Sequence, residues 1–137
     1  MTTSIFVNLP VKDLTKSKEF FSKLGYTFNK QFTDDTAASM IISDTIYAML
    51  LTHDKFKQFT KKEIVDAHSS TEVLLALSMD SKDEVNELIQ KALSAGAKEP
   101  AAAQDYGFMF SSSFEDLDGH VWEILWMDPA YVKKTSE

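Results

Sequence analysis

The sequence predicts an α+β fold built from two β-α-β-β-β modules in tandem. The first observation is order: an apolar strand, a capped helix and three extended runs follow one another in residues 1–52, and the same order returns in residues 72–128. The second is that both helical patterns end at a glycine, Gly25 and Gly96, as helices often do. The third is an Asp-Gly turn at residues 116–119, which predicts a hairpin between the last two strands.

The first module begins with a strand over residues 4–9, a β-branched and aromatic run. We expect Pro10 to end it, because proline lacks the N–H that a central strand needs. Asp13 suits the N-cap of a helix that runs to Leu24. The apolar residues expected on its buried side are Leu14, Phe20, Phe21 and Leu24. Strands are then predicted over residues 26–33, 37–43 and 46–52, separated by Asp-Asp and Asp-Thr turn signals.

Residues 53–71 form a connector with some structure of its own. A capping box from Thr60 to Glu63, followed by Ile64 and Val65, predicts a helix there. The segment exceeds the usual loop of about 4–6 residues, which is typical of a functional or structured element. Three interpretations stay open: a lid over a pocket, an interface element, or a helix docked on the surface.

The second module repeats the pattern of the first. A strand is predicted over residues 72–79, and a capping box from Ser81 to Glu84 starts a helix. Its apolar residues at helical spacing are Val85, Leu88, Ile89, Ala92 and Leu93. Three further strands are predicted over residues 98–104, 108–114 and 120–127, and residues 129–137 form a tail.

Composition excludes several classes of function. At 137 residues the chain is expected to be a single domain. It has no cysteine, which removes disulfides, thiolate metal sites and cysteine nucleophiles and is compatible with the cytoplasm. No signal sequence or long apolar run is found, so a soluble cytoplasmic protein without membrane contact is expected. The net charge of −7 disfavours nucleic acid as a partner.

Three segments of the sequence resemble the vicinal oxygen chelate superfamily, which includes lactoylglutathione lyases, bleomycin-resistance proteins and extradiol dioxygenases. They are NLPVKDLTKSKEFFSKLGY at residues 8–26, ALSMDSKDEV at residues 76–85 and FEDLDGHVWEILWMD at residues 114–128. The last resembles the family's turn-then-strand segment, with Leu117 where a proline is usual. The resemblance implies that both modules form one open, cup-shaped sheet with the helices outside and the ligand inside. It also implies a homodimer.

Metal-using members of this superfamily hold their ion with four inward-facing residues, and the resemblance carries these positions to Phe6, Leu50, Leu74 and Glu123. Only Glu123 can ligate a metal. His53, His68 and His120 do not stand at spacings that would replace the missing ligands. We therefore expect no metal or other cofactor, and a divalent ion only at an atypical site that includes Glu123.

Strand alternation predicts which residues face the cup, because alternate side chains share one face. With Glu123 inward, the predicted pocket is lined by Phe6, Asn8, Ala48, Leu50, Thr52, Leu74, Ala76, Ser78, Val121, Glu123 and Leu125, with Tyr106 at the rim. Two roles stay open for Glu123. It is either a structural acid that accepts hydrogen bonds from neighbours, or a ligand anchor or general base.

The preferred functional hypothesis is a metal-independent protein of the bleomycin-resistance type that binds a small aromatic or amphipathic molecule in an apolar cup. One alternative is a metal-dependent lyase or dioxygenase of the same superfamily, with Glu123 in an atypical site. Another is an interaction module whose cup is filled. The sequence alone does not decide whether the chain is an enzyme.

Overall fold

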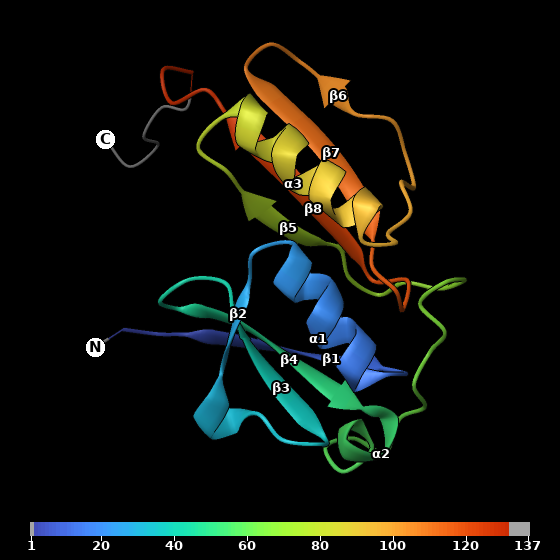
Figure 1. Cartoon of the computed structure of the whole chain (residues 1–137). Helices are drawn as coiled ribbons and strands as arrows, with labels where there is room; N and C mark the ends of the chain where they lie inside the picture. Colours follow the sequence, from blue (N-terminus) through green and yellow to red (C-terminus); the bar gives the residue numbers. More distant parts are fainter. Residues whose placement is uncertain (1, 132–137) are drawn as a thin grey trace. The chain divides into compact units, whose positions relative to one another are not determined.

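The computed structural model describes residues 2–131, which form two compact units that divide after Ser70 (Figure 1). Residues 132–137, most of the predicted tail, lie outside the described part of the chain. Among the described residues, no helix combines the length and apolar character that a membrane crossing requires.

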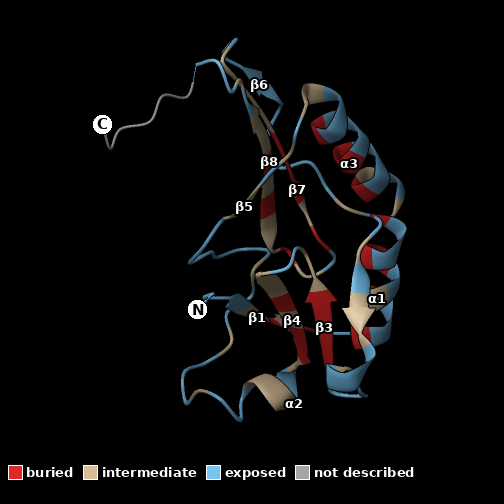
Figure 2. Ribbon diagram, turned by 90° about the vertical axis from the view of Figure 1, so that its left-hand side faces the viewer, coloured by how far each residue is buried: buried red, intermediate tan, exposed pale blue. Residues whose placement is uncertain are grey.

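The first unit is a four-stranded mixed sheet with a helix on one face (Figure 2). Its elements are β1 (Ile5–Val11), α1 (Leu14–Lys23), β2 (Thr27–Asn29), the 3-10 turn η1 (Lys30–Phe32), β3 (Ala37–Ile41), β4 (Ile46–Thr52) and α2 (His53–Phe56). The strand order is β1-β4-β3-β2, with β1 parallel to β4 and the other pairs antiparallel.

The α1 helix forms where its capping signals predict it. The Asp13 side chain accepts a hydrogen bond from the Lys16 N–H at 3.1 Å, which satisfies one of the free donors of the first turn. Gly25 follows the C-cap with φ of 104°, a conformation that glycine adopts without a Cβ clash. Leu14, Phe20, Phe21 and Leu24 are all buried, as the helical spacing predicts.

The strand β1 continues through Pro10 to Val11, so the expected end at Pro10 is wrong. Within the described part of this unit β1 pairs only with β4 and is an edge strand, where proline is tolerated. The strand predicted over residues 26–33 is also shorter, because Asn29 caps the η1 turn by accepting the Gln31 N–H at 3.0 Å.

The connector departs most from its prediction. Its helix is α2, which begins directly after β4 because Thr52 accepts the Lys55 N–H at 3.2 Å. The helix predicted from Thr60 does not form. The Thr60 hydroxyl accepts the Lys62 N–H, two residues on, and so closes a turn instead of capping a helix. Val65, one of the two apolar residues that follow the capping box, is 58% exposed.

The second unit repeats the order of the first. Its elements are β5 (Leu75–Ser78), α3 (Lys82–Ser94), β6 (Gln104–Asp105), β7 (Met109–Glu115) and β8 (Val121–Met127). The strand order is β5-β8-β7-β6, with β5 parallel to β8. Ser81 accepts the Glu84 N–H at 3.1 Å and starts α3, as the capping box predicts.

Two strands of the second unit are shorter than predicted. The strand expected over residues 98–104 is reduced to a bridge between Lys98 and Glu115 and to the two residues of β6. Pro100 interrupts it, because proline cannot donate to a ladder. The first strand spans Leu75–Ser78 in place of residues 72–79. The α+β class and the β-α-β-β-β order of both modules are confirmed, and the strands form two four-stranded mixed sheets, one in each unit.

Candidate site on the open sheet faces

In the second unit, β8 places Glu123 on the sheet face that is turned away from α3. Trp122 and Ile124 are 2% and 0% exposed, and α3 packs against β7 and β8 on their side. Because successive strand residues point to opposite faces, Glu123 lies on the other, open face, where it is half-buried.

Strand register defines the neighbours of Glu123 on this face. Glu123 is paired with Ala76 of β5 on one side and with Ser113 of β7 on the other. In the next row Leu125 is paired with Ser78 and Ser111. Between Val121 and Leu125, the rows of this open face comprise Ala76, Ser78, Ser111, Ser113, Glu115, Val121, Glu123 and Leu125. Alternation predicted that Ala76, Ser78, Val121, Glu123 and Leu125 share a face, and the sequence interpretation missed Ser111, Ser113 and Glu115.

The Glu123 carboxylate has no protein partner among the described residues of its own unit. Within residues 71–131 it forms no hydrogen bond and no ion pair. The structural role that was left open, an acid held by neighbouring donors, therefore has no support within this unit. A half-buried carboxylate on a face of small and apolar residues retains its capacity to accept hydrogen bonds.

The turn between β6 and β7 lies at the rim of this face. Gln104 is paired in register with Ser111, and the Tyr106 hydroxyl donates a hydrogen bond to the Gln104 side chain. Tyr106 itself is 55% exposed. The structure therefore puts the predicted rim residue beside the open face, with its hydroxyl already engaged.

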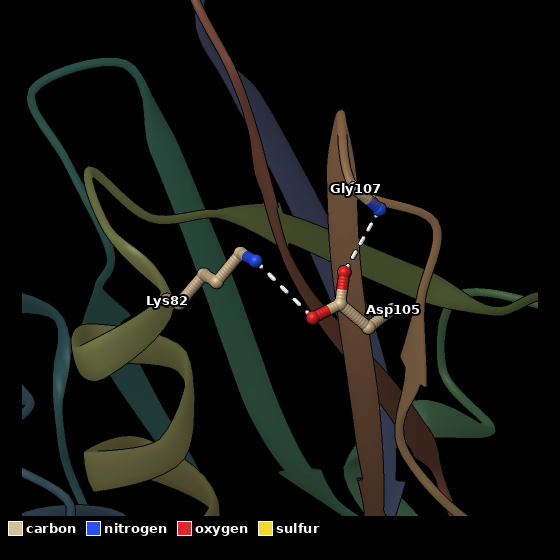
Figure 3. Close-up of polar contacts among 3 residues, drawn as sticks. All are labelled: Lys82, Asp105 and Gly107. Carbon is tan, nitrogen blue, oxygen red and sulfur yellow. Dashed lines mark hydrogen bonds and ion pairs between the residues drawn. The ribbon is translucent and has the colours of Figure 1, made fainter.

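An ion pair ties this turn to the start of α3 (Figure 3). The Lys82 Nζ lies 3.1 Å from Asp105, which also accepts the Gly107 N–H at 2.8 Å. The Gly107 hydrogen bond and Lys82 lower the pKa of Asp105 below its usual value. The same ammonium lies 5.5 Å from the centre of the Trp126 ring, within cation–π range. These contacts hold the loop that carries Tyr106.

Asp116, in the turn before β8, is an acid that sequence reasoning treated only as a hairpin signal. It is 5% exposed and accepts the Trp122 indole N–H at 3.0 Å and the backbone N–H groups of Asp118 and His120 at 2.9 and 3.0 Å. Burial raises the pKa of Asp116, while His120 and these hydrogen bonds act against that rise. Asp116 thus holds together the turn that leads into β8.

The open face of the first unit is aromatic. Phe6 is 56% exposed, and its ring stacks on that of Tyr47 with centroids 4.8 Å apart. The Tyr47 hydroxyl donates to the Asp44 carbonyl oxygen at 2.8 Å, so the stack is held at one end. The exposed Asn8 is paired in register with the half-buried Met49.

The prediction that Phe6 and Asn8 share a face with Ala48, Leu50 and Thr52 is wrong. Register pairs Phe6 with Tyr47 and Asn8 with Met49, so alternation turns the predicted three residues to the opposite face. Ala48 and Leu50 are 0% exposed there, in register with Met40 and Ala38 of β3. Tyr47 and Met49 take their place on the open face.

This register also moves one of the metal-ligand positions. Asn8 pairs with Met49 in the first unit as Ala76 pairs with Glu123 in the second, so Met49 and not Leu50 corresponds to Glu123. A thioether is a poor ligand for divalent ions that prefer oxygen or nitrogen. Leu74 precedes β5 and is 54% exposed.

The donors present do not fit the metal site of the metal-using relatives. No group of three or more His, Asp or Glu side chains that could hold an ion occurs among residues 2–131. His53 and His68 are exposed in α2 and in the connector, and the His120 N–H donates to Asp116 at the turn. A protein site for a catalytic divalent ion needs about three such ligands.

The comparisons with known proteins agree with this architecture. Residues 3–43 match the family model described as bleomycin resistance protein-like N-terminal. A hypothetical protein from S. aureus superposes with a TM-score of 0.77 at 26% identity, over 92% of this chain and 95% of that one. A glyoxalase/bleomycin resistance protein/dioxygenase family enzyme from Burkholderia phytofirmans gives a TM-score of 0.75 at 16% identity, over 92% and 99%.

A third structure belongs to a resistance protein. The genomically encoded fosfomycin resistance protein of Listeria monocytogenes superposes with a TM-score of 0.67 at 18% identity, over 98% of this chain and 95% of that one. No curated protein matches the sequence significantly. At these identities the structural matches establish a shared fold.

Proposed function

We propose that this chain is a member of the vicinal oxygen chelate superfamily that binds a small aromatic or amphipathic molecule without the superfamily's metal; the N-terminal family match and the shared fold support the membership. The observation that carries the proposal is that Glu123, on a sheet face of mostly small and apolar residues, has no hydrogen-bond or ion-pair partner among the described residues of its unit. Such a face can hold a hydrocarbon by apolar contact and orient it by one polar group.

The residues at the remaining metal positions support a metal-independent function. Phe6, Met49 and Leu74 carry no oxygen or nitrogen donor in their side chains. Phe6 stacks on Tyr47 and is more than half exposed, so its ring can receive a flat aromatic ligand. An aromatic or amphipathic ligand therefore suits the side chains better than an ion does.

One observation favours the alternative of a metal-dependent lyase or dioxygenase. The superfamily resemblance gives Glu123 the position of the terminal carboxylate ligand, and no described residue of its unit hydrogen-bonds to this carboxylate. An ion there would need further ligands from outside the unit, such as those of a second chain. This alternative is a different chemistry, so metal content separates it from the proposal.

Native mass spectrometry of the protein purified from its own host tests both. We expect a co-purifying organic molecule and much less than one equivalent of zinc, nickel, iron or manganese per chain. Stoichiometric metal that is lost in Glu123→Gln would favour the enzyme. Protein that carries neither metal nor ligand, and binds no aromatic compound when screened, would favour an interaction module whose cup is filled.

We further propose a homodimer, the assembly that the superfamily resemblance implies. The mass by light scattering at micromolar concentration should be twice that of one chain. A mass of one chain over the whole accessible concentration range would contradict this proposal.

A further inference from the structure

We propose that the group bound by Glu123 is an organic cation, an ammonium carried on an apolar or aromatic body. The inference rests on the proposed function and names the charge of its ligand. The observations that carry it are the charges and the hydrogen-bonding groups of the open face in the second unit.

This face has an excess of negative charge. Along its strands, the ionisable side chains that alternation turns to the open face are Glu123 and Glu115, and no lysine or histidine of β5, β6, β7 or β8 is among them. Lys98 is bridged in register to Glu115, which gives that acid a cationic neighbour. Glu123 has none within the described residues of its unit. The negative charge of Glu123 is therefore available to pair with a positive charge on a ligand.

The groups around Glu123 suit an ammonium. An ammonium has three N–H donors and no acceptor, so it needs several oxygen atoms on one side. Ser113 is directly beside Glu123 in register, at the typical cross-strand Cβ separation of about 4.5–5.5 Å. Ser111 and Ser78 flank Leu125 in the adjacent row. One carboxylate and neighbouring hydroxyl oxygens can thus accept from a single ammonium.

The apolar part of the ligand also has a place. Leu125 and Val121 stand on either side of Glu123 along β8, on the same face. They are half-buried, and Ala76 adds a small apolar contact from β5. A hydrocarbon or aromatic body can lie against these side chains while its ammonium reaches the carboxylate.

The charged side chains of the protein disfavour an anionic ligand. Arginine, the side chain best suited to bind carboxylates and phosphates, is absent from the sequence, and the net charge is −7. Lys82, which pairs with Asp105 of the rim turn, lies near Trp126 on the α3 side of the sheet. A neutral ligand would bind Glu123 more weakly, because hydrogen bonds between two charged groups are the stronger ones.

A series of three probes with one phenyl body tests the charge: phenylbutylamine, phenylbutanol and phenylbutanoate. Binding to the full chain is measured by two-dimensional NMR titration of the amide signals. We expect the amine to bind about tenfold or more tightly than the alcohol and the carboxylate. The shifted amides should include those of Ala76, Ser113 and Glu123.

Two variants test whether the preference for the amine depends on Glu123 itself. Glu123→Gln keeps the shape of the side chain and should remove most of the preference for the amine while leaving the alcohol's affinity within about twofold. Glu87→Gln makes the same change in net charge on the exposed surface of α3 and should leave the preference intact. Unchanged amide spectra outside the open face verify that both variants fold.

The outcomes separate this inference from the proposed function. Equal binding of amine and alcohol, or an amine preference that survives in Glu123→Gln, would overturn the cationic ligand and leave the binding function standing. A preference lost equally in Glu87→Gln would also overturn it, because general attraction to a negative protein would then explain the result. Failure of all three probes to bind would count against both.

Discussion

Replacing Asp116 by asparagine should destabilise the protein by about 1–3 kcal/mol, because the carboxylate is buried and uses both oxygens. Oδ1 accepts the N–H groups of Asp118 and His120, and Oδ2 accepts the Trp122 indole N–H. An asparagine can keep the first two bonds with its carbonyl oxygen. Its NH2 group then faces the buried indole N–H, which loses its acceptor.

The magnitude follows from this loss. A buried donor left without a partner costs about 1–3 kcal/mol, and the two remaining bonds lose the strengthening that the charge provides. Asp116→Ala removes the acceptor for all three donors, so it should cost at least about 3 kcal/mol. Asparagine should therefore be the milder substitution.

Urea denaturation followed by far-UV circular dichroism measures these free energies of unfolding. A double-mutant cycle with Trp122→Phe isolates the indole bond, because phenylalanine has no N–H. We expect Asp116→Asn to cost less in the Trp122→Phe background, with a coupling of about 1–2 kcal/mol. Equal costs in both backgrounds would refute the assigned role of the indole hydrogen bond.

The pH dependence of this effect has a definite sign. Because burial raises the pKa of Asp116, the folded state takes up the proton at a higher pH than the unfolded chain does. The wild type should then gain stability relative to Asp116→Asn as the pH falls from neutral toward the ordinary carboxyl range near about 4. A difference that shrinks over this interval would show that the hydrogen bonds and His120 outweigh burial.

Three further predictions concern the sheet faces, the metal and the rim turn. Leu50→Ala should cost about 2–5 kcal/mol, and Met49→Ala clearly less, because Leu50 is fully buried and Met49 is not; equal losses in urea denaturation would contradict the corrected register. Treatment with a chelator should leave the melting temperature unchanged, and a fall of several degrees would indicate a bound ion. Lys82→Met should leave the free energy of unfolding almost unchanged, since the ion pair is exposed, yet speed hydrogen exchange at Gly107; unchanged exchange would show that the pair does not hold the turn.

The helices were predictable because their signals are local. Asp13 and Ser81 cap the helices through their own side chains, and Gly25 and Gly96 adopt positive φ directly after the helix ends. None of these interactions depends on distant parts of the chain. The residue order alone therefore sufficed for α1 and α3 and for the repeated module.

The orientation of β4 was not predictable in the same way. Its two alternating sets, Tyr47 with Met49 and Ala48 with Leu50, are both dominated by apolar groups, so alternation does not tell the buried face from the open one. The partner strands decide it, because Asn8 pairs with Met49. In β8 the two sets differ, because Trp122 and Ile124 are buried whereas Glu123, which lies between them, is on the opposite face.

Tertiary packing explains why the role of Asp116 and the conformation after Thr60 could not be predicted from the sequence. Asp116 reads as a turn residue, since aspartate is common in turns, and its burial depends on packing around Trp122. The residues after Thr60 match a capping-box pattern, but they do not form a helix. Helix propensity alone is weak when the helix would not bury an apolar face against the rest of the protein. Local patterns therefore located the elements and missed those roles that arise from packing.

The tryptophans provide a spectroscopic consequence of the way β8 is built. Both tryptophans of the chain, Trp122 and Trp126, belong to this strand and hence to the second unit. Their fluorescence therefore reports the second unit alone, whereas circular dichroism sums the backbone of both. Coincident denaturation curves from the two signals would identify one cooperative transition, and separated curves would measure the free energy of each half of the duplicated chain without any engineered label.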